Sequence, residues 1–328
     1  MKDFRFNYIV TIHNKQDLIE QVMLGVISAW REGSFIYPVL DGCTDKTEEI
    51  IDRISRENTH IPIIKIFAPD VHEIRSINAA LRRIPQDKKG CNFILQDDVV
   101  LKAPDLEMQI RNIYDVLGYS EIGCLVFRHG VNVFADDTKQ TLEERDLIET
   151  VYGVGMCSYP LLPGQLIERM VGVRSPECIS CEVISKVGVM DENLAPYSYD
   201  NHDISLRCLK AGYKNYIYGL AFASELKWGG TRNNPHPEYG KVLERNKHYL
   251  YGKHKDFLHQ FCSSKNYKDL KAAKRFNIGR DFGGHPETEN ILNKYQKNRK
   301  RMVGKKIYFI AKYFKDPLKR VLIFLNLF

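Results

Sequence analysis

Long hydrophobic runs are absent from this sequence of 328 residues. No apolar stretch approaches the ~20 residues that a membrane-spanning helix needs, and the longest one near the C-terminus covers only residues 321–325. The N-terminus also lacks the charged and then apolar pattern of a secretory signal peptide. We therefore expect a protein that works in the cytoplasm and does not cross the bilayer as a single-pass protein.

Cysteine, proline and glycine are also scarce. The eight cysteines show no repeated spacing, and the C-x-x-C pair Cys178 and Cys181 has no second pair with which to form a structural zinc site. We therefore expect ordinary reduced thiols. Proline and glycine together supply 35 of 328 residues, whereas hydrophobic residues supply 44%. This composition excludes collagen-like and low-complexity chains and predicts a globular protein with a sizeable core.

Charge is unevenly distributed along the chain, whose net charge is +7. Residues 265–328 contain 17 Lys and Arg against 5 Asp and Glu, whereas residues 1–264 contain 31 against 36. Within this basic tail, residues 305–328 mix basic and large apolar side chains, and Pro317 divides them into two short amphipathic pieces. We expect the tail to bind an anionic membrane surface. The alternative is that it packs on the rest of the chain or on a second subunit.

Short apolar strands and amphipathic helices alternate in the first part of the chain. The pattern predicts strands at residues 8–12, 35–40, 62–67, 92–96 and 122–127, with helices at 15–30, 45–56, 72–84 and 104–117. Further along it predicts helices at 180–187 and 201–211, a strand at 215–222, mainly helices after 235, and less regular structure at 128–175. Such units indicate an α/β fold with a mostly parallel sheet and helices on both faces. Ligands of such folds bind beyond the carboxyl ends of the strands.

Two adjacent carboxylates, Asp97 and Asp98, follow the apolar strand predicted at residues 92–96. Like charges side by side are unfavourable unless a cation lies between them or water solvates both. Mg²⁺ and Mn²⁺ prefer carboxylate oxygens and leave coordination positions for substrate phosphates. The pair therefore indicates a divalent metal site, with a solvated turn as the alternative.

Three further motifs accompany this pair in a fixed order. They are T-I-H-N at residues 11–14, D-G-C-T-D-K-T at 41–47 and D-I-S-L-R-C-L-K-A-G-Y at 203–213. Over roughly residues 6–255, the sequence resembles the family 2 glycosyltransferases of the GT-A fold. The resemblance implies a Rossmann-like GT-A domain at residues 1–255, and residues 256–328 then form a basic helical C-terminal extension.

The resemblance also implies a site for a nucleotide-sugar donor. Asp41 would accept a hydrogen bond from the N3–H of a uracil-type base, with Thr11 and His13 in the same pocket, so UDP-sugars are favoured. The alternative for Asp41 is a turn residue. Asp97 would face the ribose, and Asp98 would bind Mn²⁺ or Mg²⁺, which bridges the diphosphate.

Three more residues have two interpretations each. Arg75 lies where the family often places a basic residue near the nucleotide, although a solvated helix face is the alternative. Asp45 is expected to cap the following helix rather than to contact ligand. Glu225 would offer an oxygen to the metal where many family members have a histidine, and His236 is a later candidate. The alternative for Glu225 is a solvated side chain.

The catalytic motif departs from the family pattern. Aligning Asp203 and Arg207 with D-L-x-x-R puts Asp200 at the family's Glu and Asn201 at the Asp that normally deprotonates the acceptor. Asn201 cannot take a proton, so the role would pass to Asp200 first and to Asp203 second. Otherwise activity is weak or lost, or Asn201 is an altered residue in this particular chain. The alternative for Asp200 is that it caps the following helix.

The implied activity is the inverting transfer of a sugar from a nucleoside diphosphate to a hydroxyl of a saccharide or glycolipid acceptor. Bacterial surface polysaccharide assembly is the usual setting, with the enzyme in the cytoplasm or peripheral at the inner face of the cell membrane. A sugar nucleotidyltransferase is one alternative, but residues 13–17 (H-N-K-Q-D) lack its Gly-rich basic loop. A nucleic-acid-binding protein is another, but the tail has no recognisable reading motif and residues 1–264 are acidic, so we expect no nucleic-acid partner.

Overall fold

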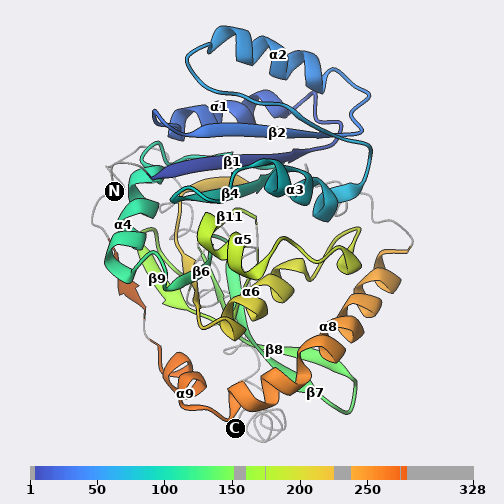
Figure 1. Cartoon of the computed structure of the whole chain (residues 1–328), viewed down its shortest axis with the longest axis vertical. Helices are drawn as coiled ribbons and strands as arrows, with labels where there is room; N and C mark the ends of the chain where they lie inside the picture. The colour runs from blue at the N-terminus through green and yellow to red at the C-terminus, as the bar shows by residue number, and fades with distance from the viewer. Residues whose placement is uncertain (1–3, 151–159, 174, 225–237, 274, 279–328) are drawn as a thin grey trace, which may run out of the picture. The chain divides into compact units, whose positions relative to one another are not determined.

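A nine-stranded sheet forms the centre of the structure, with the strand order β14-β9-β12-β6-β11-β4-β1-β2-β3 (Figure 1). The structure is a computed structural model that describes residues 4–150, 160–173, 175–224, 238–273 and 275–278. The strands of this sheet are β1 (Arg5–Ile12), β2 (Phe35–Asp41), β3 (Ile66–Ala68), β4 (Gly90–Gln96), β6 (Ile122–Val126), β9 (Gln165–Glu168), β11 (Glu177–Ser180), β12 (Lys214–Tyr218) and β14 (Phe276–Asn277).

Most strands of this sheet run in one direction. The pairs β1–β2, β1–β4, β2–β3 and β6–β12 are parallel. Strands β9 and β11 are antiparallel to each of their neighbours. Seven of the nine described strands therefore share one direction. This confirms the predicted α/β fold with a mostly parallel sheet.

Helices cover both faces of the sheet (Figure 1). One face carries α1 (Ile19–Ala29), α2 (Thr47–Glu57) and α4 (Leu106–Leu117), and the other carries α3 (His72–Arg83), α5 (Cys181–Val187) and α6 (Asp200–Lys210). Each face of the sheet has its own hydrophobic core, because successive side chains of a strand point to opposite faces. In β1, Tyr8 and Val10 pack into the core beneath α1, α2 and α4, whereas Ile9 packs into the core on the other face. Fully burying one aliphatic side chain in such a core contributes about 1.5–3 kcal/mol.

A second, smaller sheet lies within residues 128–175, for which the sequence pattern predicted less regular structure. Strands β7 (His129–Asp136) and β8 (Thr141–Glu149) form a hairpin, and β10 (Val171–Val173) pairs with β7. The long helix α8 (Tyr239–Cys262) packs on the hairpin, and α9 (Lys265–Lys271) follows it. The pattern missed β8 because four successive residues of this strand, 143–146, are exposed, so apolar and polar side chains do not alternate there.

Three short elements complete the described fold: β5 (Val99–Leu101), which pairs with β13 (Phe222–Ser224), and the 3₁₀ turn η1 (Glu192–Leu194). Two predicted strands are shorter than expected. The strand predicted at residues 62–67 is reduced to β3 at the sheet edge, where Ile63 makes only an isolated bridge to Ile36. The strand predicted at 215–222 ends at Tyr218, and residues 222–224 pair with β5 instead.

The chain divides into two compact units, residues 1–283 and 284–328. The second unit, including the basic segment 305–328, lies outside the described residues. The domain boundary predicted at residue 255 stays a prediction, and α8 runs through that position. Among the described helices, none is both long enough and apolar enough to cross a membrane.

The cysteines of the described residues are free thiols, as expected. Cys178 and Cys181 are buried between the sheet and its helices, and burial raises the pKa of the Cys181 thiol to about 11. A thiol with so high a pKa is a poor nucleophile and a poor metal ligand at neutral pH. We therefore assign these cysteines to the core.

Candidate active site at the carboxyl ends of the strands

The carboxyl ends of β1, β2 and β4 meet at one edge of the sheet. Strand β1 lies between the other two, and Thr11, which is buried, pairs with Val39 of β2 and with Gln96 of β4. Just beyond β1, His13 connects both neighbours: its Nδ1–H donates to the carbonyl oxygen of Asp41 at 2.6 Å, and its backbone N–H donates to Asp97 Oδ2 at 3.0 Å. The structure thus brings together four of the predicted nucleotide-binding residues.

Reciprocal hydrogen bonds fix the loops that follow β1 and β2. Asn14 adopts a left-handed backbone conformation (φ 47°), and its Oδ1 accepts from the amides of Thr44 at 2.8 Å and Asp45 at 3.3 Å. Asp45 in turn accepts from the amides of Gln16 and Thr47, each at 3.0 Å. Burial acts to raise the pKa of Asp45, but these hydrogen bonds outweigh it and hold the pKa below its usual value. The predicted capping role is thus only partly met, because the N-cap residue of α2 is Lys46, without a side-chain capping bond, and Asp45 supports the helix start from the position before it.

Asp41 is held at the end of β2 by a close contact between loops. Its Oδ1 accepts from the backbone N–H of Val71 at 2.7 Å, and the side chain is buried. The next residue, Gly42, has φ +59°, and a Cβ there would lie 2.6 Å from the Cβ of Asp70. Only glycine lets the two loops approach so closely. Val71 N–H thus fixes one carboxylate oxygen of Asp41 and leaves the other as an acceptor for a ligand.

Asp97 is a carboxyl group with 15% of its side chain exposed and an unusually high pKa. Burial raises its pKa to about 7, and the neighbouring Asp98 and Glu73 act in the same direction. Lys15, with its Nζ 3.6 Å from Asp97 Oδ1, and the His13 N–H act against this rise. Loss of hydration, more than the neighbouring carboxylates, therefore disfavours the ionised form of Asp97.

Asp98 has an unsatisfied oxygen. The residue is 8% exposed, and its Oδ1 is buried without a hydrogen-bond partner among the described residues. A buried carboxylate oxygen without a donor is costly unless a cation approaches it. Asp98 beside Asp97 therefore fits a hard divalent cation. No cluster of three or more metal-binding side chains occurs in the described parts of the chain, and Glu225 and His236 lie outside them.

Two basic residues near the aspartates escaped the sequence analysis. Lys15 pairs with Asp97, and its nearness to T-I-H-N was the signal that could have identified it. Arg128, at the end of β6, is buried and donates from Nη2 to Ser224 Oγ at 2.6 Å. Ser224 pairs with Val99, the residue after Asp98. A buried arginine at this position follows from tertiary pairing, which no local pattern revealed.

Helix α3 borders the same edge. Glu73 accepts a hydrogen bond from Gln96 Nε2 at 2.5 Å, which places the start of α3 beside the end of β4. Arg75, two residues further along α3, pairs with Glu192 of η1 at 3.7 Å from Nε to Oε2, and half of its side chain is exposed. The predicted role of Arg75 in nucleotide binding stays a prediction.

The first turn of α6 contacts β11, the strand beside β4. Asp200 and Asn201 are both buried there, and Asn201 Nδ2 donates to Glu177 Oε2 at 2.8 Å. Glu177 is fully buried in β11, opposite Ile94 of β4. The sequence analysis missed Glu177, because a single Glu after a proline carries no recognisable signal. Asn201, which the sequence resemblance aligns with a catalytic Asp, is thus bonded to a carboxylate from another element.

Asp203 is bound in a different way. It is fully buried and accepts from Arg207 Nε at 2.7 Å, Lys253 Nζ at 2.7 Å and His254 Nε2 at 2.8 Å. Burial acts to raise the pKa of Asp203, but these three partners outweigh it and hold the pKa well below its usual range. A carboxylate so stabilised in its ionised form is a weak proton acceptor. Through Lys253 and His254, Asp203 links α6 to α8.

Comparisons with known proteins identify the fold. No family model matches the chain, and no curated protein matches it. The chain is similar to the mannosyltransferase PcManGT from Pyrobaculum calidifontis, solved with GDP-Man and Mn²⁺ (12% identity, TM-score 0.50, 97% of this chain and 82% of that one). It is also similar to residues 1–349 of TarS from S. aureus, solved with UDP-GlcNAc (10% identity, TM-score 0.52, 89% and 80%). The fold is that of GT-A glycosyltransferases, and at these identities the likeness shows the fold alone.

The pKa of Asp97 leads to a prediction about stability. Because the carboxyl group holds its proton more tightly in the folded protein than in the unfolded chain, its contribution to stability is present at low pH and is lost as the pH rises through about 7. In metal-free buffer, we expect Asp97→Asn to become more stable than the wild type as the pH increases. Between about pH 5.5 and 8.5, this difference in the free energy of unfolding should grow by roughly 1–3 kcal/mol, measured by denaturant titration.

Asp45→Asn serves as the control for this prediction. The pKa of Asp45 is lowered, so its contribution is already complete above its usual pKa. That variant should therefore lose about the same stability at both pH values. If the difference between Asp97→Asn and the wild type does not change with pH, the assigned pKa of Asp97 is wrong.

Proposed function

We propose that this protein is an inverting, metal-dependent glycosyltransferase of family 2 that uses a nucleotide-sugar donor. One observation supports this most directly: in a GT-A fold, the buried Asp98 oxygen without a hydrogen-bond partner lies beside Asp97 at the carboxyl ends of the strands. This is the edge at which open α/β sheets bind ligands. A divalent cation would offset the negative charge of the two aspartates, and its remaining coordination positions would take the diphosphate of the donor.

The donor nucleotide is proposed to bind between the ends of β1 and β2. Val71 N–H fixes Asp41 Oδ1, so the second oxygen of this carboxylate can accept from the N3–H of uracil. Thr11 and His13 flank the base, Asp97 faces the ribose, and Arg75 reaches toward the nucleotide. UDP-sugars are accordingly the favoured donors.

Asp98 would hold Mn²⁺ or Mg²⁺ with help from Asp97, and Glu225 is a further proposed ligand. When bound, the metal supplies positive charge that stabilises the leaving diphosphate. Lys15 and Arg128 would add positive charge around the diphosphate. Lys15 forms an ion pair with Asp97, and Arg128 donates a hydrogen bond to Ser224, which pairs with Val99 next to Asp98.

The proton of the acceptor hydroxyl is proposed to pass to Asp200. The hydroxyl oxygen then attacks the anomeric carbon on the side opposite the diphosphate. The bond from carbon to the diphosphate oxygen breaks, its electron pair leaves with the diphosphate, and the anomeric configuration inverts. Asp203 was the second choice, but Arg207, Lys253 and His254 already stabilise its charge. We therefore retain Asp200.

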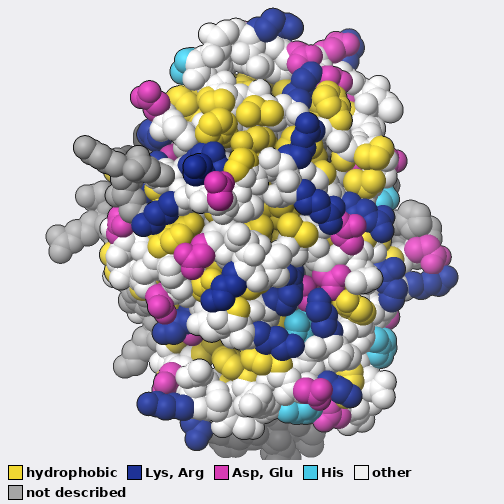
Figure 2. All heavy atoms as spheres, in the orientation of Figure 1, with side chains coloured by type: hydrophobic (Ala, Val, Ile, Leu, Met, Phe, Trp, Pro, Cys, Tyr) yellow, Lys and Arg dark blue, Asp and Glu magenta, His cyan; other side chains and the backbone are white. Residues whose placement is uncertain are grey.

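The acceptor is proposed to be a saccharide or glycolipid of bacterial surface polysaccharide assembly. The basic tail would bring the enzyme to the inner face of the cell membrane. A nucleic-acid partner is not proposed, because acidic and basic side chains are interspersed on the face seen in Figure 2 and no continuous basic stripe is visible there. The nucleotidyltransferase alternative lacks its phosphate-binding loop after β1, where His13 and Asn14 bind neighbouring protein groups instead.

Asp98→Ala tests the proposed donor and metal site. We expect UDP with Mn²⁺ to raise the melting temperature of the wild-type protein, whereas RNA does not. In Asp98→Ala, the Mn²⁺-dependent part of UDP binding should disappear while the fold remains intact, because the main metal ligand is lost. Calorimetric titration of UDP with and without Mn²⁺ measures this. Asp137→Ala, on the exposed end of the hairpin, is the control, and equal metal-assisted binding in all three proteins rejects the metal assignment.

Asp200→Asn tests the proposed base. Turnover should fall by roughly 10²-fold or more with little change in donor affinity, because the amide cannot take the proton. Full turnover in this variant would transfer the role to another group.

The companion variant is Asn201→Asp. The Glu177 contact predicts that this change alone gives no large gain, since two carboxylates 2.8 Å apart would have to share a proton. Combining it with Glu177→Gln removes that conflict. A rate well above wild type in the double variant would show that the chain lacks its usual base.

Liposome co-sedimentation tests the membrane role of the tail. Each Lys or Arg near an anionic surface contributes ~1 kcal/mol, so the full chain should pellet with anionic vesicles at low salt and less at high salt. A version ending near residue 300 should not pellet, and neutral vesicles provide the control. Negligible pelleting of both versions would favour packing of the tail on the enzyme or on a second subunit.

A further inference from the structure

The chain enters the first turn of α6 through a strained loop. Residues 194–199 connect η1 to α6, and Ser198 (φ 77°) and Tyr199 (φ 68°) both adopt left-handed backbone conformations. Side chains with a Cβ disfavour this region, and two successive residues in it persist only where surrounding structure holds them. Tyr199 is also the N-cap residue of α6, and its side chain makes no capping hydrogen bond. The conformation of this loop therefore depends on contacts from elsewhere.

Helix α8 supplies those contacts through one buried amide. Asn246 is fully buried, and its Nδ2 donates to the carbonyl oxygens of Leu194 at 2.9 Å, Tyr197 at 3.1 Å and Ser198 at 3.0 Å. One amide group thus binds three carbonyls of the same loop. An aspartate at this position would present oxygens to those carbonyls and would repel them.

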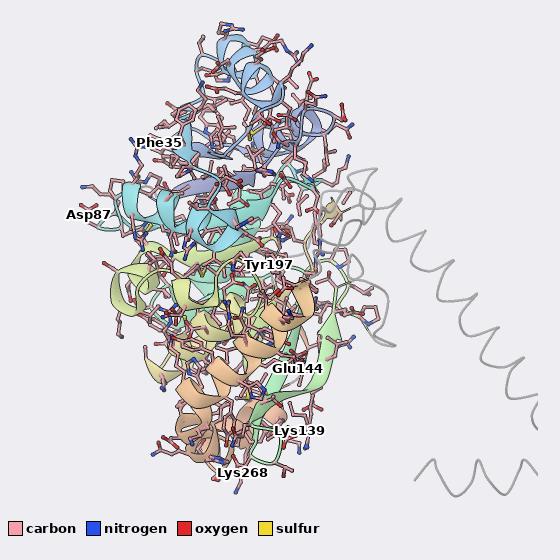
Figure 3. All side chains as sticks on the ribbon, turned by 90° about the vertical axis from the view of Figure 1, so that its right-hand side faces the viewer. Phe35, Asp87, Lys139, Glu144, Tyr197 and Lys268 are labelled. Carbon is pink, nitrogen blue, oxygen red and sulfur yellow. The ribbon has the colours of Figure 1, made fainter. Side chains whose placement is uncertain are left out.

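Arg245 completes the arrangement from the preceding position of α8. Its Nη2 donates to the carbonyl oxygen of Ala195 at 2.5 Å. Its Nε and Nη2 also donate to Asn246 Oδ1 at 3.0 and 2.8 Å, which orients the amide so that Nδ2 faces the loop. Figure 3 shows Tyr197 beside the N-terminal end of α8, in agreement with the 5.4 Å separation of the Tyr197 and Tyr239 rings.

The loop transmits its position directly to α6. The carbonyl oxygen of Tyr199 accepts from the backbone N–H of Asp203 at 3.0 Å, which closes the first turn of the helix. That turn contains Asp200 and Asn201. A shift of Ser198 or Tyr199 toward ordinary backbone angles would therefore rotate the turn and displace both side chains.

We propose that Arg245 and Asn246 are positioning residues of the transfer reaction. They hold the loop at 194–199 in its strained form, so that Asp200 meets the acceptor hydroxyl. The inference rests on the proposed glycosyltransferase function. It adds a pair of residues some 45 positions further along the chain, which do not touch substrate and act through the loop backbone.

Asn246→Ala is the main test. In the full-length protein, we expect turnover of a UDP-sugar to fall ~10- to 100-fold, because small displacements of reacting groups cost that much. Affinity for UDP with Mn²⁺ should change less than twofold, since the donor pocket lies at other strand ends. The amide of Asp203 should exchange its hydrogen faster, which reports loosening of the first turn. Arg245→Met, which leaves Asn246 in place, should show the same effects in weaker form. It replaces Asn246→Ala as the test if Asn246→Ala does not fold.

A rescue variant separates positioning from general stability. Ser198→Gly lowers the cost of the left-handed conformation, so it should restore part of the turnover in the Asn246→Ala background and change little by itself. The matched control is Tyr251→Phe, which removes a 2.8 Å hydrogen bond from α8 to Asp137 of the hairpin. This control should leave turnover and Asp203 exchange unchanged.

The outcomes distinguish this inference from the proposed function. If the wild-type protein neither binds UDP with Mn²⁺ nor turns over any UDP-sugar, the proposed function fails, and Asp203 exchange still decides whether Asn246 holds the loop. If the wild-type protein is active and Asn246→Ala matches it in turnover and exchange, the positioning role is wrong. Lowered turnover without rescue by Ser198→Gly, together with an equal loss in Tyr251→Phe, would reduce the role of Asn246 to stability.

Discussion

Uncompensated negative charge at one edge of the sheet is the constraint on which this structure depends. Asp41 ends β2, and Asp97 and Asp98 follow β4, two strands that flank β1 and are held there because the apolar residues of all three must be buried on both faces. Adjacent carboxylates such as Asp97 and Asp98 are unfavourable in isolation. The fold offsets part of the cost with backbone N–H donors and with Lys15, whereas Asp98 Oδ1 has no hydrogen-bond partner among the described residues.

The acidic residues of α6 show how two carboxylates three positions apart acquire different properties. Asp203 faces α8 and is surrounded by three basic side chains, so it serves the packing of one helix on another. Asp200 begins the helix on the side of the candidate active site, where Asn201 meets Glu177 from β11. Sequence spacing alone makes the two aspartates equivalent candidates. Tertiary partners separate them, because ionisation depends on what surrounds a group.

Much of the fold could be predicted from the sequence, because alternating strand and helix periods are local properties. The ends of β1, β2 and β4 could be located from the polar residues that follow them, and the structure joins His13, Asp41 and Asp97 by hydrogen bonds. The hairpin at β7 and β8 could not be predicted, since an exposed strand lacks alternation. Glu177, Arg128 and Asn246 could not be identified either, because their partners lie on distant parts of the chain.

The near-neutral pKa of Asp97 has a consequence for how the protein would respond to its surroundings. With a pKa of about 7, this carboxyl group changes charge near neutral pH. The proposed metal, if Asp97 helps to hold it, would have to displace a proton, so metal uptake and proton release would be thermodynamically linked. Acidification would then weaken binding of the metal, and the occupancy of the proposed site would report the acidity of the surroundings.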